Sequence, residues 1–331
     1  MKYNYDLVLE YILSQQDEDG SFITYRINPK QYPNQKVKRI PDPSPFLTAN
    51  ILYSLMCSND VRFETIIERG QQFLISMGTS GFWRFWPKNT QSDVVPFDLD
   101  DTAICSFVLK DKITFDNRKV ISRNVDKNGY FYTWLRPSFR FFVSHPSEFS
   151  LFIKSIFESF KTLFRKKLLG LSDKEPAVAA NVLLYLGQSD KNKKCIEIII
   201  KEVETQDFEL QFYEDEICLY YHISRAYKNG ISSFQKVSDI ICNRIAERVL
   251  HDSELTDLHK VMAANVLLDF GGFHDVSSLM IHSLIHSSKF PDKWEADTYF
   301  CGKQRIFQAG SPVLTAALLV EAMAKLNRNE K

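Results

Sequence analysis

Apolar residues at helical spacing recur along almost the whole chain and limit it to a mostly helical fold. The first such stripe is formed by Leu7, Tyr11 and Ile12. Strand signals are sparse, and the extended pieces at 20–40 and 129–137 fit loops or short hairpins. The pattern therefore predicts an all-α protein. Further helices are expected at 45–58, 63–77, 100–109, 147–169, 176–187, 190–205, 213–228, 232–250, 256–270, 274–288 and 310–327.

The polar turns between these helices form a weak internal repeat. Each turn follows a helix, usually contains a glycine, and ends in an aromatic residue that can pack back between neighbouring helices. The segments 16–22, 81–83, 126–131 and 291–294 follow this pattern. Stacked helical hairpins can close into a ring, so the repeat predicts an α/α barrel. No linker rich in Pro, Ser or Gly divides the chain, which predicts one domain over residues 1–331.

The charge balance argues against nucleic acid as a partner. Lys and Arg together number 41, as do Asp and Glu, whereas phosphate binding needs a surplus of cations. The six cysteines are scattered without a CxxC pair, so neither a disulfide framework nor a zinc ribbon is expected. An apolar leader and a long apolar run are both missing, which predicts a cytoplasmic protein.

Three carboxylates fall within the four residues Asp98-Leu99-Asp100-Asp101, at the start of the helix expected at 100–109. One Asp would be enough to cap the N-terminus of a helix. Three carboxyl groups this close cannot all ionise at low cost, so at least one pKa is expected to rise. A carboxyl group that stays protonated near neutral pH is a candidate general acid.

The segment 98–103, which reads DLDDTA, resembles the DxDDTA motif of squalene–hopene cyclases and other class II terpene cyclases. The aromatic turns are similar to degenerate QW repeats of that family. Residues 178–183 are similar to the segment that carries the partner of the family's catalytic acid, commonly His and here Asn181. Residues 310–318 resemble its closing helix. The resemblance spans most of the chain and implies a single (α/α)6 barrel of the terpene cyclase and prenyltransferase type.

The resemblance also implies a mechanism, in which a linear isoprenoid such as farnesyl or geranylgeranyl diphosphate is cyclised after protonation. Asp100 would be the general acid, Asp98 and Asp101 would polarise it, and Asn181 would hydrogen-bond to it. Aromatic faces would line the cavity and stabilise the carbocation. The predicted wall residues are Phe82, Trp83, Trp86, Phe97, Phe131, Trp134, Trp294, Tyr299 and Phe300.

The class I DDxxD motif, which ionises a diphosphate, is absent, so a diphosphate should survive the reaction. The cations predicted to bind it are Arg136, Arg140, Lys303 and Arg305. Acid-first chemistry needs no cofactor and no metal, and Mg²⁺ would assist only if the substrate is a diphosphate. His282 and His286 have a metal-ligand spacing, but no third ligand is evident.

Several alternatives stay open at this level. Class II cyclases commonly pair this barrel with a second helical domain, so a partner subunit or a second copy of the chain could complete the pocket. A non-catalytic barrel that binds an isoprenoid or a protein would have an exposed or ion-paired Asp100. A carbohydrate enzyme would need two carboxylates across a polar groove. The apolar and basic faces of 139–171 fit either a barrel helix or a peripheral membrane contact.

Overall fold

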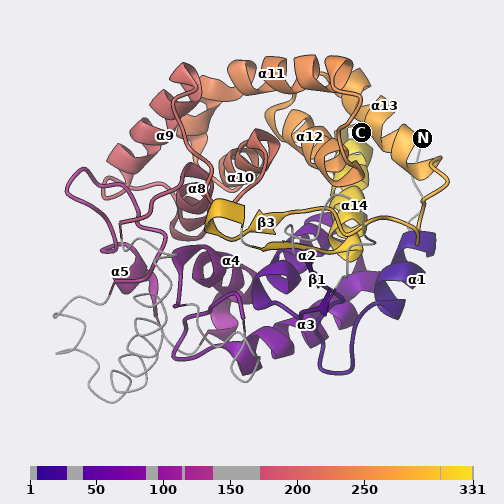
Figure 1. The fold of residues 1–331 in the computed structure, drawn as a ribbon, viewed down its shortest axis with the longest axis horizontal. Helices are drawn as coiled ribbons and strands as arrows, with labels where there is room; N and C mark the ends of the chain where they lie inside the picture. Colours follow the sequence, from indigo (N-terminus) through magenta and orange to yellow (C-terminus); the bar gives the residue numbers. More distant parts are fainter. Residues whose placement is uncertain are drawn as a thin grey trace.

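The computed structural model describes residues 6–27, 40–86, 96–113, 116–136, 172–305 and 307–329. In these residues the protein is mostly helical (Figure 1). The α-helices are α1 (Asp6–Ser14), α2 (Pro45–Ser58), α3 (Glu64–Met77), α4 (Leu99–Leu109), α5 (Arg118–Ile121), α8 (Pro176–Leu186), α9 (Lys193–Thr205), α10 (Glu216–Lys228), α11 (Ser238–His251), α12 (Asp257–Phe270), α13 (His274–Ile285) and α14 (Pro312–Asn329). The 3-10 helices are η2 (Val61–Phe63), η3 (Lys110–Lys112), η4 (Ser232–Val237) and η5 (Lys303–Arg305).

Six helices make a closed ring of neighbour contacts. In order around the ring, α2 contacts α4, α4 contacts α8, α8 contacts α10, α10 contacts α12, α12 contacts α14, and α14 contacts α2 again. The helices α3, α9, α11 and α13 each contact one or two of these six, and Figure 1 shows them outside the ring. Helices of the ring are apolar around most of their circumference, whereas α9 and α11 have one apolar face, as expected of inner and outer positions.

Each ring helix begins at a residue suited to a helix start. Three begin with a proline, whose missing N–H group is not needed at the first position. The other three are preceded by a side chain that accepts a hydrogen bond from the first turn. The prolines are Pro45, Pro176 and Pro312, and the capping side chains are Asp98, Asp215 and Thr256.

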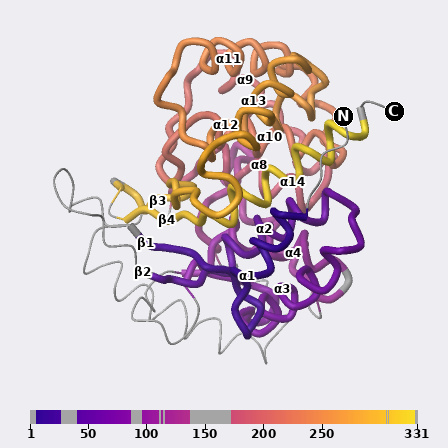
Figure 2. Tube along the Cα trace, turned by 90° about the vertical axis from the view of Figure 1, so that its right-hand side faces the viewer, coloured from indigo at the N-terminus to yellow at the C-terminus, as the bar shows by residue number. Residues whose placement is uncertain are grey.

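A small antiparallel sheet joins a segment from the N-terminal part of the chain to one from the C-terminal part. Its strands are β1 (Tyr25–Ile27), β2 (Ile40–Pro41), β3 (Phe300–Cys301) and β4 (Gln308–Gly310), in the order β2-β1-β4-β3. Figure 2 shows the sheet at one end of the ring and the C-terminus at the other. The pairing of β1 with β2 agrees with the short hairpin expected at 20–40. The strands β3 and β4 were not expected, because strands of two or three residues are too short to produce an alternating pattern.

Most of the predicted helices agree with the structure to within a few residues. The segment 45–58 corresponds to α2, whereas 232–250 divides into η4 and α11. In the first stripe Leu7 is 57% exposed, and Val8 takes its place beside Tyr11 and Ile12 in the core. The predicted helix at 147–169 and the amphipathic segment 139–171 lie outside the described residues. Within the described ranges, no helix has the length and apolar character needed to cross a bilayer.

Three of the four aromatic turns close through an isolated antiparallel bridge. These bridges pair Gln16 with Phe22, Thr79 with Phe82, and Val125 with Phe131. In the first turn, Gln16 Nε2 donates to the carbonyl oxygens of Gly20 (3.1 Å) and Ile66 (3.0 Å), which ties the turn to α3. The repeat therefore marks a turn that is closed by a bridge in three of the four cases, and the first of these turns is tied to α3.

We expect Gly20→Ala to destabilise the fold more than Gly187→Ala does. Both glycines have positive φ, at +91° and +76°. A Cβ on Gly20 would lie 2.2 Å from the carbonyl oxygen of Arg69, whereas nothing lies within 4 Å of the corresponding position at Gly187. The conformation alone costs about 1 kcal/mol, so we expect Gly20→Ala to cost at least about 2 kcal/mol. Denaturant unfolding measures both values, and equal losses would contradict the close approach.

Candidate active site

The three carboxylates predicted from the sequence lie together at the start of α4, and all three are buried. Asp98, Asp100 and Asp101 are 6%, 2% and 1% exposed. Asp98 precedes the helix, and its Oδ1 accepts a hydrogen bond from the backbone N–H group of Asp101 at 2.7 Å. Asp98 also forms an isolated antiparallel bridge with Trp134. One carboxylate thus caps the helix, and two remain available for other contacts.

Asp100 is held from both sides by hydrogen-bond donors on other elements. The Nδ2 atom of Asn181, on α8, donates to Asp100 Oδ1. The hydroxyl of Tyr213, just before α10, donates to Asp100 Oδ2. The Asn181 contact is the one expected from the sequence, whereas Tyr213 was not anticipated. Because both donors are buried, the orientation of the Asp100 carboxyl group is fixed.

Burial raises the pKa of all three carboxyl groups. For Asp98 and Asp101 the rise is large, because desolvation is reinforced by the neighbouring carboxylates. For Asp100, desolvation also raises the pKa, but the hydrogen bonds from Tyr213 and Asn181 and the charge of Arg225 oppose it. Asp100 is therefore protonated more readily than an exposed Asp, yet it is the member of the group whose anion is best stabilised. That balance suits a group that must donate a proton.

We expect Asp101→Asn to stabilise the protein at alkaline pH and to have little effect near pH 4. Because the pKa of Asp101 is raised on folding, the folded state keeps a proton that the unfolded state releases above about pH 3.9. Stability then falls as pH rises from there through the folded pKa. Removing the carboxyl group should restore about 1–2 kcal/mol at pH 8. Thermal unfolding at several pH values measures this, and a pH-independent difference would contradict it.

A cluster of stacked and edge-on rings lies next to Asp100, and we call it the aromatic cluster. Tyr213 connects the two, because its hydroxyl contacts Asp100 while its ring lies 5.9 Å from that of Phe300. Phe300 stacks on Phe85 at 4.9 Å and on Phe212 at 6.1 Å. The cluster consists of Phe46, Phe85, Trp86, Trp134, Phe212, Tyr213, Tyr299, Phe300 and Phe307.

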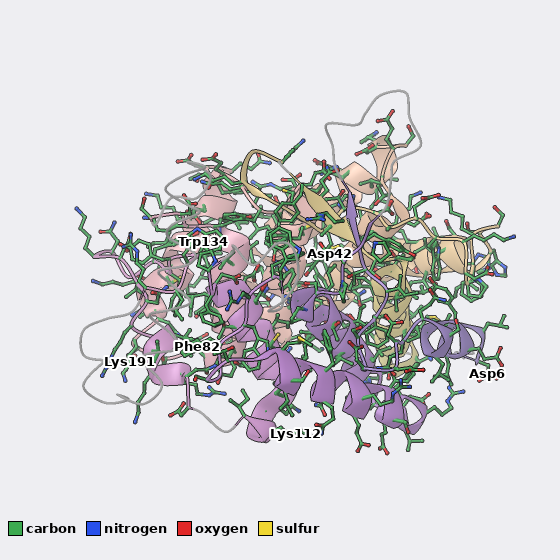
Figure 3. All side chains as sticks on the ribbon, turned by 60° about the horizontal axis from the view of Figure 1, so that its bottom comes forward. Asp6, Asp42, Phe82, Lys112, Trp134 and Lys191 are labelled. Carbon is green, nitrogen blue, oxygen red and sulfur yellow. The ribbon has the colours of Figure 1, made fainter. Side chains whose placement is uncertain are left out.

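Two tryptophans of the aromatic cluster donate hydrogen bonds to aspartate side chains. Trp86 Nε1 donates to Asp42 Oδ2 at 2.7 Å, and Trp134 Nε1 donates to Asp173 Oδ2 at 3.3 Å. Figure 3 shows Asp42 and Trp134 inside the outline of the molecule, with Asp6, Lys112 and Lys191 at the periphery. The structure therefore brings four predicted wall residues together, namely Trp86, Trp134, Tyr299 and Phe300.

The other predicted wall residues lie in different surroundings. Phe82 and Phe97 pack against each other at 6.2 Å. Trp83 donates from Nε1 to the Leu74 carbonyl oxygen at 2.8 Å, between α3 and α4. Phe131 closes the turn that begins at Val125. Trp294 packs on Tyr11 at 6.4 Å and on Phe290 at 5.7 Å. Trp83, Phe131 and Trp294 thus belong to the aromatic turns or to packing between helices.

The cations predicted to bind a diphosphate are engaged with other groups. Lys303 forms an ion pair with Asp173, and Arg305 lies 3.7 Å from Glu214. The guanidinium of Arg136 lies over the ring of Tyr132 at 3.9 Å. Arg140 lies outside the described residues. Lys303 is nonetheless close to the aromatic cluster, because its partner Asp173 also accepts from Trp134.

Sequence reasoning missed two residues behind Asn181. Arg225, on α10, donates to Asn181 Oδ1 and, at 2.8 Å, to Asn50 Oδ1 on α2. A signal for the asparagines was present. The pattern Ala-Asn, then Ile or Val, then Leu occurs at 49–52, 180–183 and 264–267, in three alternate helices of the ring. Arg225 has no comparable pattern, and only the fold reveals its position.

No metal site is evident in the described part of the chain, where no three His, Cys, Asp or Glu side chains come together in a suitable group. His282 and His286, on and just after α13, have ring centroids 4.1 Å apart. Lys325 forms buried ion pairs with Asp269 and Glu321. These two carboxylates are the only metal-ligand side chains in that cluster of described residues.

Comparison with known proteins supports the fold. No protein-family model matches the chain, and no curated protein matches it. Among solved structures, a protein from Actinoplanes is similar, with a TM-score of 0.63 and 12% identity over 97% of this chain and 98% of that one. The ent-copalyl diphosphate synthase from Streptomyces platensis is similar with a TM-score of 0.60 and 13% identity.

The second similarity covers 86% of this chain and 50% of the synthase, so the chain spans half the length of that enzyme. At such low identity the likeness shows the fold alone. The protein therefore has a mostly helical, terpene-cyclase-like fold.

Proposed function

We propose that this protein is a class II terpene cyclase, a single α/α-barrel domain that cyclises a linear isoprenoid after protonating it. The observation that carries the proposal is the pairing of a buried Asp100 with Asn181 and Tyr213. A lone capping carboxylate would not need two buried donors from elsewhere in the fold. The buried position also opposes the reading of a non-catalytic barrel in which Asp100 is exposed.

In this mechanism Asp100 is the general acid. Its O–H bond breaks as a C–H bond forms at the terminal alkene of the isoprenoid, which leaves a tertiary carbocation. Asn181 and Tyr213 stabilise the Asp100 carboxylate that results. Internal alkenes then attack the cation in turn, and loss of a proton or capture of water ends the sequence. Asp98 and Asp101 would polarise Asp100 and remain protonated, because the pKa of each is raised by burial.

The aromatic cluster would stabilise the moving cation. Faces of Phe, Tyr and Trp attract a cation through their quadrupole and do not trap it as a nucleophile would. In a linear isoprenoid diphosphate the anionic head group lies at the opposite end of the molecule from the terminal alkene that Asp100 protonates. The proposed substrates are farnesyl or geranylgeranyl diphosphate, with Lys303 near the head group and Mg²⁺ as an aid to binding only.

An incubation with each diphosphate tests the proposal. The products are dephosphorylated and analysed by mass spectrometry, with and without Mg²⁺. The expected result is a cyclised alcohol, because acid-first chemistry leaves the diphosphate in place. An acyclic hydrocarbon or release of diphosphate would indicate ionisation first and would contradict the proposal. If neither substrate reacts, adding the missing half of a two-domain cyclase as a separate subunit tests whether a partner completes the site.

A further inference from the structure

A fully buried arginine lies behind the catalytic pair without a carboxylate among the acceptors of its hydrogen bonds. Arg225 is 0% exposed, and its side chain donates to two amide oxygens, Asn50 Oδ1 and Asn181 Oδ1. The rings of Tyr53 and Tyr221 lie 5.2 and 5.1 Å from its guanidinium carbon. Burying a charge without a carboxylate partner costs free energy, so the presence of Arg225 at this site indicates a role other than stabilising the fold.

The chemistry of the guanidinium group dictates how Asn181 is oriented. An arginine has donors only, so the atom of Asn181 that faces it must be the amide oxygen. The amide nitrogen then faces the other way, toward Asp100 Oδ1. We infer that Arg225 is a positioning residue for the proposed reaction, which fixes the Asn181 amide so that it can only donate to Asp100. This inference deepens the proposed function and rests on it.

The second branch of the network has the same fixed polarity. Asn50 Oδ1 accepts from Arg225 and also from the hydroxyl of Tyr299, at 3.0 Å. Because that hydroxyl donates to Asn50, it must accept from His222 Nε2, 2.8 Å away. His222 is then a neutral ring with its proton on Nε2, in line with a pKa well below the ordinary value through burial and Arg225.

This branch also reaches the second donor of Asp100. The ring of His222 packs edge-on against Tyr213 at 4.8 Å, and Tyr213 donates to Asp100 Oδ2. One arginine therefore orients both partners of the acid, one by direct hydrogen bonding and one through packing. Without it, the Asn181 amide could rotate and present its oxygen to Asp100, which would direct the acidic proton toward Asn181.

The orientation matters because it decides where the acidic proton points. With a donor on each oxygen of Asp100, the proton must occupy a position facing neither Asn181 nor Tyr213. That leaves it free for transfer to the alkene. The positive charge of Arg225 additionally stabilises the carboxylate that forms. The titratable or charged groups that interact with Asp100 are Asp98 just before α4, Asp101 and Cys105 on α4, Glu175 before α8, Tyr213 and Arg225 at α10, and Tyr299 before β3.

Two readouts on Arg225→Met test the inference, and one of them needs no substrate. In infrared difference spectra, the band of the protonated Asp100 carboxyl group is identified because it is lost in Asp100→Asn. The intensity of this band is then measured as a function of pH. In Arg225→Met the band is expected to persist to higher pH than in the wild type, because the charge that stabilises the Asp100 carboxylate is removed and the Asn181 amide is no longer held as a donor. In the cyclisation assay, we expect kcat to fall roughly 10- to 100-fold and its alkaline limb to move to higher pH.

Controls separate positioning from stability. Arg225→Lys keeps the positive charge and a group that can donate to Asn181, so the Asp100 band and kcat should depend on pH almost as in the wild type. Arg244→Met removes another arginine bonded to neutral oxygens, those of Val203 and Tyr220, and should leave the Asp100 band unmoved. If Arg225→Met does not fold, Arg225→Gln replaces it as the neutral variant. If the Asp100 band of the folded neutral variant disappears at the same pH as in the wild type, the inference is overturned. If the band shifts as expected but the wild-type protein forms no cyclised product, the proposed function fails instead.

Discussion

Asp100→Asn is expected to lower cyclisation by at least about 100-fold and to leave the fold intact. The amide cannot supply the proton that starts the reaction, although its oxygen can still accept from Asn181 or Tyr213. The pKa of Asp100 is raised by burial, so losing the carboxyl group should not reduce stability at neutral pH. Product yield by mass spectrometry and thermal unfolding of the same preparation measure the two effects.

The matched control for this variant is Asp190→Asn, which makes the same chemical change at an exposed position. It should leave product yield unchanged. Equal yields from wild type and Asp100→Asn would remove Asp100 as the acid. A loss of yield that is accompanied by unfolding would instead assign Asp100 a structural role.

Lys325→Met is expected to be the most destabilising of the substitutions considered for the fold. Its Nζ lies 2.8 Å from Asp269 Oδ2 and 2.7 Å from Glu321 Oε1, and both carboxylates are fully buried. Removing the cation leaves these two negative charges buried without their partner. Loss of one member of a buried ion pair costs about 3–5 kcal/mol, which is a large share of the stability of a typical domain.

Denaturant unfolding of two further variants identifies the cause. In the triple variant Lys325→Met, Asp269→Asn, Glu321→Gln this cluster carries no charge, so we expect the variant to regain much of the lost stability. Lys193→Met removes an exposed lysine that lies 4.0 Å from Glu197, and should change stability by less than about 1 kcal/mol. A decrease of less than about 1 kcal/mol in the free energy of unfolding of Lys325→Met would contradict this account, because it would show that water solvates the carboxylates of Asp269 and Glu321.

The helical fold and the acidic segment could be predicted because their signals are local. Apolar spacing marks α2, α8 and α12 almost to the residue, and the DLDDTA segment is unusual enough to identify the start of α4. The Asn181 contact with Asp100 followed from a resemblance, since nothing in the local sequence joins residues 81 positions apart. Strands as short as β3 and β4 carry no periodic signal, and they form because residues 300–310 lie beside β1.

The rest of the site depends on contacts that close across the ring. Tyr213 and Arg225 lie on or near α10, and neither shows a spacing that points to Asp100. The aromatic residues predicted to line a cavity fall into two groups, those in the aromatic cluster and those that pack elsewhere, for the same reason. Trp86 and Phe300 meet in the aromatic cluster, whereas Trp294 packs on Tyr11, although all three look alike in sequence. Composition shows that aromatic residues are abundant, and only the topology assigns each one to a site or to packing.

The most direct test of acid-first cyclisation is the source of the hydrogen that the product gains. Wild-type protein is incubated with geranylgeranyl diphosphate in deuterium oxide, and the dephosphorylated product is examined by mass spectrometry and NMR. If Asp100 donates an exchangeable proton, the cyclised alcohol will carry one solvent-derived deuterium, on the ring carbon formed from the protonated alkene. A cyclised product without solvent deuterium would contradict protonation as the first step.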